Sequence, residues 1–286
     1  MIQENHSLAR YGTYQIGGLA DYFVEVKTEQ ELKEALTWAD QKKLKSFVFG
    51  GASNLLFDDA GFRGLVVRIR LQSIEVRADL AEIQAEAGTS TMQVVKAAAE
   101  AGLSGMEAWN GLPGTVGGAV VGNAGCFGVE TKDILKWAEV LENGKVRRLA
   151  PADLGYSYRN SLLKHSTAVV LRACFQLTHG EPLSIQEKMK EIVRVRAGKQ
   201  PPGLSTGSFF KNPSVEQSAG FLIDQCGLKG AQLGQAQISP RHGNFFVNLG
   251  GATAQNILDL GKMAQDAVHE KFGLTLEREI VFVPAQ

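Results

Sequence analysis

The sequence GLPGTVGGAVVGNAG, at residues 111–125, decides how the rest of the chain is interpreted. Glycine recurs at positions 111, 114, 117, 118, 122 and 125, and the run carries no charge. Its large side chains are too few for a core helix or strand, whereas Val116, Val120 and Val121 make it too apolar for a flexible linker. Glycine permits positive φ and a close backbone approach to a ligand. We expect a loop whose amide groups cradle the pyrophosphate of a dinucleotide cofactor, with a structural glycine-rich turn as the alternative.

A second glycine-rich segment, GGASNLL at residues 50–56, follows a short buried strand expected at residues 46–49. A strand that leads directly into glycines is a further candidate for phosphate binding. The segment lacks the Lys-Ser/Thr ending of a P-loop and the G-x-G-x-x-G spacing of the common dinucleotide-binding fold. Both common nucleotide-binding folds are therefore disfavoured.

The composition is that of an ordinary globular protein. Of 286 residues, 44% are hydrophobic and 21% are charged, which argues against wholesale disorder. Lys plus Arg and Asp plus Glu each number 30, so nothing indicates a general affinity for nucleic acid or for acidic membranes. The length allows about two or three domains.

Cysteine usage and the amino-terminal sequence bear on the cellular compartment. Cys126, Cys174 and Cys226 are widely spaced and form no C-x-x-C, so neither a metal site nor a redox pair is expected. Free thiols suit a reducing compartment. The first residues, MIQENH, do not resemble a signal peptide, and no 18-residue apolar window indicates a membrane span. We expect a cytoplasmic location.

Hydrophobic periodicity and capping signals predict irregularly alternating helices and strands, hence an α+β chain. Thr28 and Glu31 form a capping box before the first helix, and Asn143-Gly144 is typical of a hairpin turn within residues 137–149. Helices are predicted at residues 90–101, 184–198, 217–226 and 253–272, and strands at 20–26, 64–70, 82–87, 167–177, 245–249 and 274–283.

Six segments in order along the chain resemble the UDP-N-acetylenolpyruvoylglucosamine reductases, also called UDP-N-acetylmuramate dehydrogenases. One of these segments alone would be weakly specific, but together they cover nearly the whole chain. The short interval between Arg159 and Ser208 is similar to the shorter subtype of the family. The matching segments are residues 50–56, 111–125, 158–161, 207–213, 219–230 and 276–280.

The resemblance implies a two-part FAD-binding region of the vanillyl-alcohol-oxidase (PCMH) type, followed by an α+β substrate-binding domain. The expected parts are residues 1–60 and 61–180 for FAD and residues 181–286 for the substrate. It also implies that the two glycine loops hold FAD non-covalently. The implied cofactor-binding residues are Gly50, Gly51, Ala52, Ser53, Asn54, Leu55, Gly111, Gly114, Thr115, Gly117, Gly118, Ala119, Asn123 and Gly125.

The resemblance further implies an oxidoreductase of peptidoglycan precursor synthesis, acting in the cytoplasm on a small UDP-sugar enolpyruvyl ether. NADPH is the implied co-substrate, and its hydride reaches the enolpyruvyl methylene carbon through the flavin. The enolate that results is then protonated. No nucleic acid, metal or membrane span is part of this expectation.

Three catalytic residues are implied by position. Arg159 would hold a carboxylate in a planar two-point grip, although a solvated surface arginine is the alternative. Ser208 would donate the proton to the enolate, with a loop-capping role as its alternative. Glu279 would stabilise the developing enol in a protonated or proton-sharing form. Strand alternation places Glu277 and Glu279 on one face, so only the family register selects Glu279.

Substrate contacts are implied at positions that would surround the sugar nucleotide, where lysines suit a diphosphate as point charges. Each has a structural alternative, most plainly a solvated Lys211 and a structural His242. The residues are Tyr158, Lys199, Lys211, Asn212, Lys229 and His242.

Two other functions remain open at this point. A flavin oxidase or dehydrogenase of a small alcohol or sugar lactone would share the fold, but such enzymes often tether flavin through a histidine, which neither glycine loop contains. A non-catalytic nucleotide-binding protein would use the same loops without turnover. The presence of Arg159, Ser208 and Glu279 argues against both.

Overall fold

The computed structural model describes residues 1–214 and 216–285, with all of their side chains except that of Lys199. Apart from Met1, the chain forms two compact units that alternate along the sequence. The first unit comprises Val24–Gly51 and Val66–Arg196, and the second comprises Ile2–Phe23, Ala52–Leu65 and Ala197–Gln286. The division at residues 60 and 180 into three consecutive domains stays a prediction.

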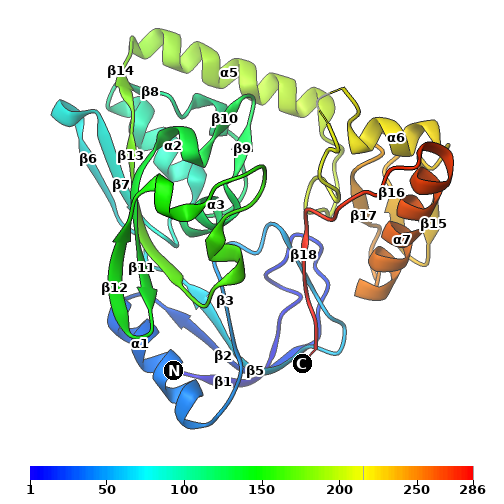
Figure 1. Cartoon of the computed structure of the whole chain (residues 1–286), viewed down its shortest axis with the longest axis horizontal. Coiled ribbons are helices and arrows are strands. Elements are labelled where there is room, and N and C mark those ends of the chain that lie inside the picture. Colours follow the sequence, from blue (N-terminus) through cyan, green and yellow to red (C-terminus); the bar gives the residue numbers. More distant parts are fainter. Residues whose placement is uncertain (215, 286) are drawn as a thin grey trace. The chain divides into compact units, whose positions relative to one another are not determined.

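The first unit is built on a five-stranded antiparallel sheet in the order β12-β11-β13-β7-β6 (Figure 1). Asn143 and Gly144 form the turn between β11 and β12 at φ angles of 50° and 75°, which confirms the predicted hairpin. The strands are β6 (Ile74–Arg77), β7 (Glu82–Glu86), β11 (Leu135–Glu142), β12 (Lys145–Leu149) and β13 (Val169–Gln176).

Two helices of the first unit begin at side-chain caps. Thr28 accepts a hydrogen bond from the Glu31 amide at the start of α1 (Glu29–Gln41), and Ser90 and Gln93 form a capping box at the start of α2 (Thr91–Glu100). The carboxylate of Glu31 accepts a hydrogen bond from the Lys27 amide, whereas the capping box predicted a bond from the Thr28 amide.

The remaining elements of the first unit are short. They are β3 (Ser46–Phe49), β8 (Leu103–Ser104), α3 (Val116–Gly122), β9 (Gly125–Cys126), β10 (Val129–Glu130), α4 (Thr131–Ile134) and β14 (Thr178–His179), with short 3-10 turns at Ala78–Leu80, Glu107–Trp109, Pro151–Leu154 and Leu162–His165.

Three elements extend across the division between the units. The strands β2 (Leu19–Val26) and β5 (Phe62–Ile69) begin in the second unit and end in the first. The helix α5 (Pro182–Lys199) begins in the first unit and ends in the second. This helix starts two residues before the predicted Ser184, because the fixed φ of proline suits the first helical position.

The expectation that residues 111–125 form no helix is wrong, because Val116–Gly122 is the helix α3. Two of its three valines, Val116 and Val120, are fully buried. A Cβ at Gly117 would lie 3.0 Å from the Ala87 Cβ, so glycine lets the helix approach the chain that follows β7. Tertiary packing therefore overrides the low helix propensity of glycine.

The second unit combines an antiparallel sheet in the order β15-β16-β17 with the helices α6 and α7. Its core contains a cluster of three phenylalanines: Phe209 and Phe246 stack at 4.3 Å between ring centroids, and Phe210 meets both edge-on. β1 pairs antiparallel with β2, and β4 pairs parallel with β18. The bounds are β1 (Gln3–Ser7), β4 (Leu55–Phe57), α6 (Ala219–Gln225), β15 (Gln232–Leu233), β16 (Ala236–Ile238), β17 (Phe246–Asn248), α7 (Ala254–Phe272) and β18 (Val281–Val283).

The strand predicted over residues 274–283 is shorter in the structure. Only Val281–Val283 forms a strand, while Arg278 makes an isolated bridge to Phe210. The two glutamates differ in exposure, and their placement on one face stays a prediction. The Glu277 side chain is 71% exposed and pairs with Lys211, whereas Glu279 is half-buried.

Glycine is essential at one turn of the second unit, where Gly61 adopts a φ of 87°. A Cβ at this position would lie 1.9 Å from the Leu19 carbonyl oxygen. We expect Gly61→Ala to lower the free energy of unfolding by well over the ~1–2 kcal/mol of left-handed strain alone. Gly273→Ala is the matched control, because Gly273 has a φ of 68° and nothing lies within 4 Å of a Cβ added there. Equal midpoints of urea unfolding for the two variants would contradict this prediction.

Candidate active site

The glycine loop ends in a helix start that is fixed by backbone hydrogen bonds. The Val116 amide donates to the Thr89 carbonyl and the Gly117 amide to the Ala87 carbonyl, both at 2.9 Å. Upstream, Gly111 and Gly114 have φ angles of 83° and 116°. The path of this loop therefore depends on glycine.

Within the first unit, this loop lies directly against Gly50 and Gly51. A Cβ at Gly50 would lie 2.3 Å from Thr115 Oγ1, and one at Gly51 would lie 3.2 Å from the Gly114 Cα. Thr115 Oγ1 is buried and has no hydrogen-bond partner among the described residues. Such an orphaned hydroxyl between two glycine segments fits a site that a phosphate-bearing ligand completes.

The other predicted cofactor residues have different environments. Gly118 is exposed, while Ala119 and Gly125 are buried. Asn123 is fully buried, and its amide Nδ2 donates to the Glu130 carboxylate and to the Ser157 carbonyl. The Asn123 side chain is therefore already hydrogen-bonded within the protein. Its predicted contact with the cofactor would have to use its backbone atoms.

Ala52, Ser53, Asn54 and Leu55 belong to the second unit. Ala52 has a positive φ of 52°. The Asn54 side chain donates to the Glu279 carbonyl at 3.0 Å, and the Val281 amide donates to the Asn54 carbonyl at 3.0 Å. This segment is thus connected to the chain around the predicted catalytic glutamate.

Arg159 lies on a tight turn whose flanking residues, Ser157 and Asn160, exchange two backbone hydrogen bonds of 3.1 Å. Its φ is 56°, an uncommon conformation for a residue other than glycine. The guanidinium donates to the Gly125 carbonyl at 2.7 Å and lies 5.1 Å from the Tyr158 ring centroid. These contacts hold the Arg159 side chain in place. It is therefore not the solvated surface arginine of the alternative interpretation.

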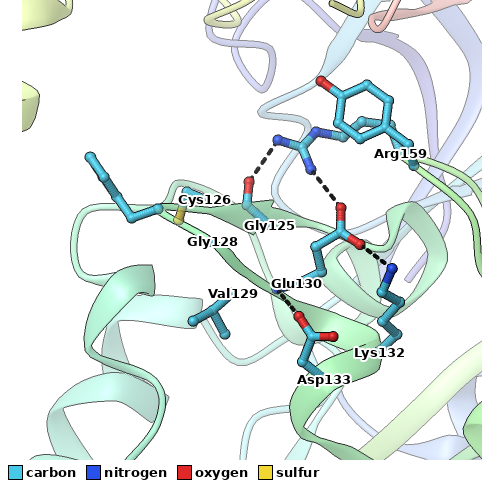
Figure 2. Close-up of a pocket in the computed structure, with 10 residues that line it drawn as sticks. Gly125, Cys126, Gly128, Val129, Glu130, Lys132, Asp133 and Arg159 are labelled. Carbon is cyan, nitrogen blue, oxygen red and sulfur yellow. Dashed lines mark hydrogen bonds and ion pairs between the residues drawn. The ribbon is translucent and has the colours of Figure 1, made fainter. Parts of the chain in front are cut away.

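The Arg159 guanidinium lines a pocket of about 420 Å³ (Figure 2). The pocket is formed by the β9–β10 hairpin, the start of α4 and the turn that carries Arg159. Its lining residues are Gly125, Cys126, Phe127, Gly128, Val129, Glu130, Lys132, Asp133, Tyr158 and Arg159. A cation at the wall of such a pocket is suited to an anionic ligand.

Cys126 is half-buried and lines the same pocket. Its Sγ donates to the Ala108 carbonyl and accepts from the Arg196 guanidinium at 3.0 Å. Burial raises the pKa of this thiol, and the positive charges of Arg196 and Arg159 offset only part of that rise. The cysteine is therefore a neutral thiol at pH 7.

In the second unit, the segments of Ser208 and Glu279 lie side by side. The Glu279 amide donates to the Phe209 carbonyl at 2.9 Å, and the Phe209 amide donates to the Asn244 carbonyl at 2.8 Å. Ser208 itself is half-buried and forms a bridge with Phe245. The structure thus brings two of the three predicted catalytic residues onto neighbouring segments, while Arg159 belongs to the first unit.

Two predicted lysine contacts are engaged in ion pairs. Lys211 Nζ lies 2.5 Å from a Glu277 carboxylate oxygen, and Lys229 Nζ lies 2.6 Å from an Asp224 carboxylate oxygen. The Lys199 side chain lies outside the described side chains. A diphosphate would therefore have to compete with a carboxylate for Lys211 and for Lys229.

Asn212 and His242 lie around the start of α6. Asn212 Oδ1 accepts a hydrogen bond from the Ala219 amide, and His242 Nδ1 accepts one from the Asn244 amide. Burial, together with the nearby Lys229 charge, lowers the pKa of His242. The imidazole is therefore neutral at pH 7 and can contact a ligand only through hydrogen bonds.

The class of protein follows from these sites together with a comparison to known domains. Residues 20–150, which contain both glycine loops, match the FAD binding domain. The chain is therefore a flavoprotein with an FAD-binding region followed by a carboxyl-terminal domain. Residues 200–283, which contain Ser208 and Glu279, match the UDP-N-acetylenolpyruvoylglucosamine reductase C-terminal domain. The chain belongs to the UDP-N-acetylenolpyruvoylglucosamine reductase family of oxidoreductases.

Relatives of that name match over nearly the full length. The reductase of Lactobacillus delbrueckii subsp. bulgaricus is 43% identical, covering 98% of this chain and 94% of its own. That of Rubrobacter xylanophilus is 40% identical, covering 96% and 92%. The crystal structure of UDP-N-acetylenolpyruvylglucosamine reductase from Thermus caldophilus is 38% identical, with a TM-score of 0.84 over 99% of this chain and 98% of that one. These matches confirm the predicted FAD-binding region followed by a carboxyl-terminal α+β domain.

Two other kinds of feature are absent from the part of the chain that the structure describes. None of the described helices has the length and apolar character needed to cross a membrane. Within the same residues, no group of three or more His, Cys, Asp or Glu could hold a metal ion.

The sequence interpretation missed Glu130, which lies against Arg159 in the pocket. A signal was present, because Glu130 is the first charged residue after the uncharged run that begins at Gly111. It could not be read without the β9–β10 hairpin, which pairs Glu130 with Gly125.

Proposed function

We propose that this flavoprotein reduces UDP-N-acetyl-3-O-(1-carboxyvinyl)glucosamine to UDP-N-acetylmuramate, a step of peptidoglycan precursor synthesis, with NADPH as the reductant. The observation that carries the proposal is the pocket in which Arg159 is held against the Gly125 carbonyl. Nearly full-length similarity to reductases of this name supports the same substrate.

The two glycine loops are the proposed FAD site. Bound FAD would supply the carrier that accepts a hydride from NADPH and delivers it to the enolpyruvyl methylene carbon. Gly50, Gly51 and Gly114 would let the backbone approach the pyrophosphate, and the orphaned Thr115 hydroxyl would gain a hydrogen-bond acceptor there. Residues Ala52, Ser53, Asn54, Leu55, Gly111, Gly117, Gly118, Ala119, Asn123 and Gly125 are proposed to complete the site.

Arg159 is proposed to bind the substrate carboxylate. A guanidinium offers two parallel N–H donors that match a carboxylate in one plane. Hydride addition to the methylene carbon places negative charge on the neighbouring carbon and its carboxylate. Arg159 would stabilise that charge as it develops, which lowers the barrier to addition.

Ser208 is proposed to protonate the enolate, which completes the lactyl ether. A serine is a poor acid in water, so it needs a site that stabilises its alkoxide or relays a proton to it. The neighbouring segment carries Glu279, proposed to act in a protonated or proton-sharing form, because a bare carboxylate would repel the enolate.

The remaining proposed contacts are to the sugar nucleotide. Lys211 and Lys229 would exchange their present carboxylate partners for the diphosphate, and His242 would contribute hydrogen bonds in its neutral form. Tyr158, Lys199 and Asn212 are further proposed contacts.

An anaerobic two-step experiment tests the proposal. Protein loaded with FAD is expected to lose its yellow absorbance when NADPH is added and to regain it when the enolpyruvyl substrate follows. UDP-N-acetylglucosamine without the enolpyruvyl group serves as the control and should restore nothing. Protein that cannot be loaded with FAD, or that regains colour only with oxygen, would overturn the proposal.

A further inference from the structure

We propose that Glu130 is a positioning residue for Arg159, fixing its guanidinium at the pocket wall so that it meets the substrate carboxylate in one orientation. The inference rests on the proposed role of Arg159. It concerns residues of the first unit only.

The backbone of Arg159 is fixed from several sides. The turn of residues 157–160 is closed by the Ser157–Asn160 bridge. Lys164 Nζ donates to the Arg159 carbonyl, and the hydroxyl of Ser161, the next residue after the turn, donates to the Val121 carbonyl at 2.6 Å. A long side chain on so rigid a turn still has four rotatable bonds, so its far end needs its own constraint.

The β9–β10 hairpin supplies that constraint. Gly125 and Glu130 are paired residues of the hairpin, and both face the guanidinium (Figure 2). The Gly125 carbonyl accepts from Arg159 Nη2 at 2.7 Å, while Glu130 Oε1 lies 3.8 Å from Nη1. Two different nitrogens are thus restrained, which fixes the rotation of the guanidinium plane as well as its place.

Glu130 is itself held in place. Its Oε2 accepts from Asn123 Nδ2 at 3.1 Å and pairs with Lys132 Nζ at 2.9 Å, and its amide donates to Asp133 Oδ2 at 2.8 Å. Asn123 Nδ2 also donates to the Ser157 carbonyl at 3.0 Å. One buried amide therefore connects the carboxylate that faces the guanidinium to the turn that carries the Arg159 backbone.

The distance of 3.8 Å decides what Glu130 does to Arg159. It is too long for a hydrogen bond and within the range of an ion pair. The attraction therefore orients the guanidinium by charge, and an incoming carboxylate has no hydrogen bond to break at this pair. Glu130 would act through Arg159 without touching the substrate.

Two substitutions separate charge from shape. Glu130→Gln keeps an oxygen that can accept from Asn123 but removes the charge, and Glu130→Ala removes both. We expect FAD content and flavin reduction by NADPH to be unchanged in both variants. Reoxidation by the enolpyruvyl substrate should slow about tenfold in Glu130→Gln and about a hundredfold in Glu130→Ala. This is the scale expected when a reacting group is misplaced. Calorimetry with the oxidised holoprotein should show weaker substrate binding in the same order.

Glu142→Gln is the matched control, because Glu142 pairs with Arg147 at 2.7 Å in the β11–β12 hairpin. It should behave as the unchanged protein in every assay. Thermal unfolding of each variant shows whether a loss reflects folding.

A double-mutant cycle decides the outcome. In an Arg159→Ala background, Glu130→Gln should cause no further slowing, because its effect passes through the missing side chain. Additive effects, or Glu130 variants that match the unchanged protein while Arg159→Ala is slow, would overturn the inference alone. Normal reoxidation in Arg159→Ala would overturn both the proposed role of Arg159 and the inference.

Discussion

Ser208→Ala is expected to leave flavin reduction by NADPH unchanged and to slow reoxidation by the enolpyruvyl substrate about a thousandfold. The physical reason is that alanine cannot donate the proton that the enolate needs, and proton transfer by a positioned group is worth roughly 10²–10⁴ in rate. The backbone of this segment is held by the Phe209–Asn244 hydrogen bond and the bridge to Phe245, so the fold should survive the substitution. Stopped-flow absorbance separates the two half-reactions.

Ser205→Ala is the control for the Ser208 result. Ser205 belongs to the same loop, and its hydroxyl accepts a hydrogen bond from the Gly207 amide at 3.2 Å. It should slow neither half-reaction by more than a small factor. Equal losses in both half-reactions of Ser208→Ala, or no loss in either, would remove Ser208 from the role of proton donor.

Gly50→Ala is expected to weaken FAD binding by about tenfold to a hundredfold. The added methyl carbon would lie 2.3 Å from Thr115 Oγ1, and Thr115 is buried with little room to move. Overpacking of this kind costs about 1–3 kcal/mol, which corresponds to that range of affinity. Fluorescence titration of the apoprotein with FAD measures the change directly.

Gly122→Ala provides the control for Gly50→Ala. Gly122 ends the helix α3 of the same loop, and nothing lies within 4 Å of an added methyl group there. FAD affinity should stay unchanged in this variant. If Gly50→Ala binds FAD as tightly as Gly122→Ala does, the contact between the two glycine segments has no part in holding the cofactor.

Local signals in the sequence predicted much of the fold. The Asn143-Gly144 turn, the Ser90 helix start and the helix α7 all follow from short-range chemistry, and the structure confirms them. Elements that depend on distant partners were missed or misjudged. α3 exists because its glycines pack against the chain after β7. Of residues 274–283, Val281–Val283 forms a strand with β4, while Arg278 makes only an isolated bridge to Phe210.

In the candidate site, too, the features that depend on distant partners could not be predicted from the sequence. Six ordered segments predicted the family and fold class, which the comparisons confirm, while the roles of Arg159, Ser208 and Glu279 stay predictions. Sequence alone could not show that the Asn123 side chain is hydrogen-bonded within the protein, or that Glu130 faces Arg159. Both facts depend on side-chain contacts that form only on folding.

The parallel pairing of β4 with β18 constrains the order in which the second unit can fold. Val283 pairs with Phe57, and Asn54 bonds to residues 279 and 281, so the second unit joins segments about 225 residues apart in the sequence. A ribosome has synthesised nearly the whole chain before these partners exist together. The early part of the second unit must therefore wait, unpaired along β4, until the last strand emerges, and closing so long a loop makes this a late event in folding.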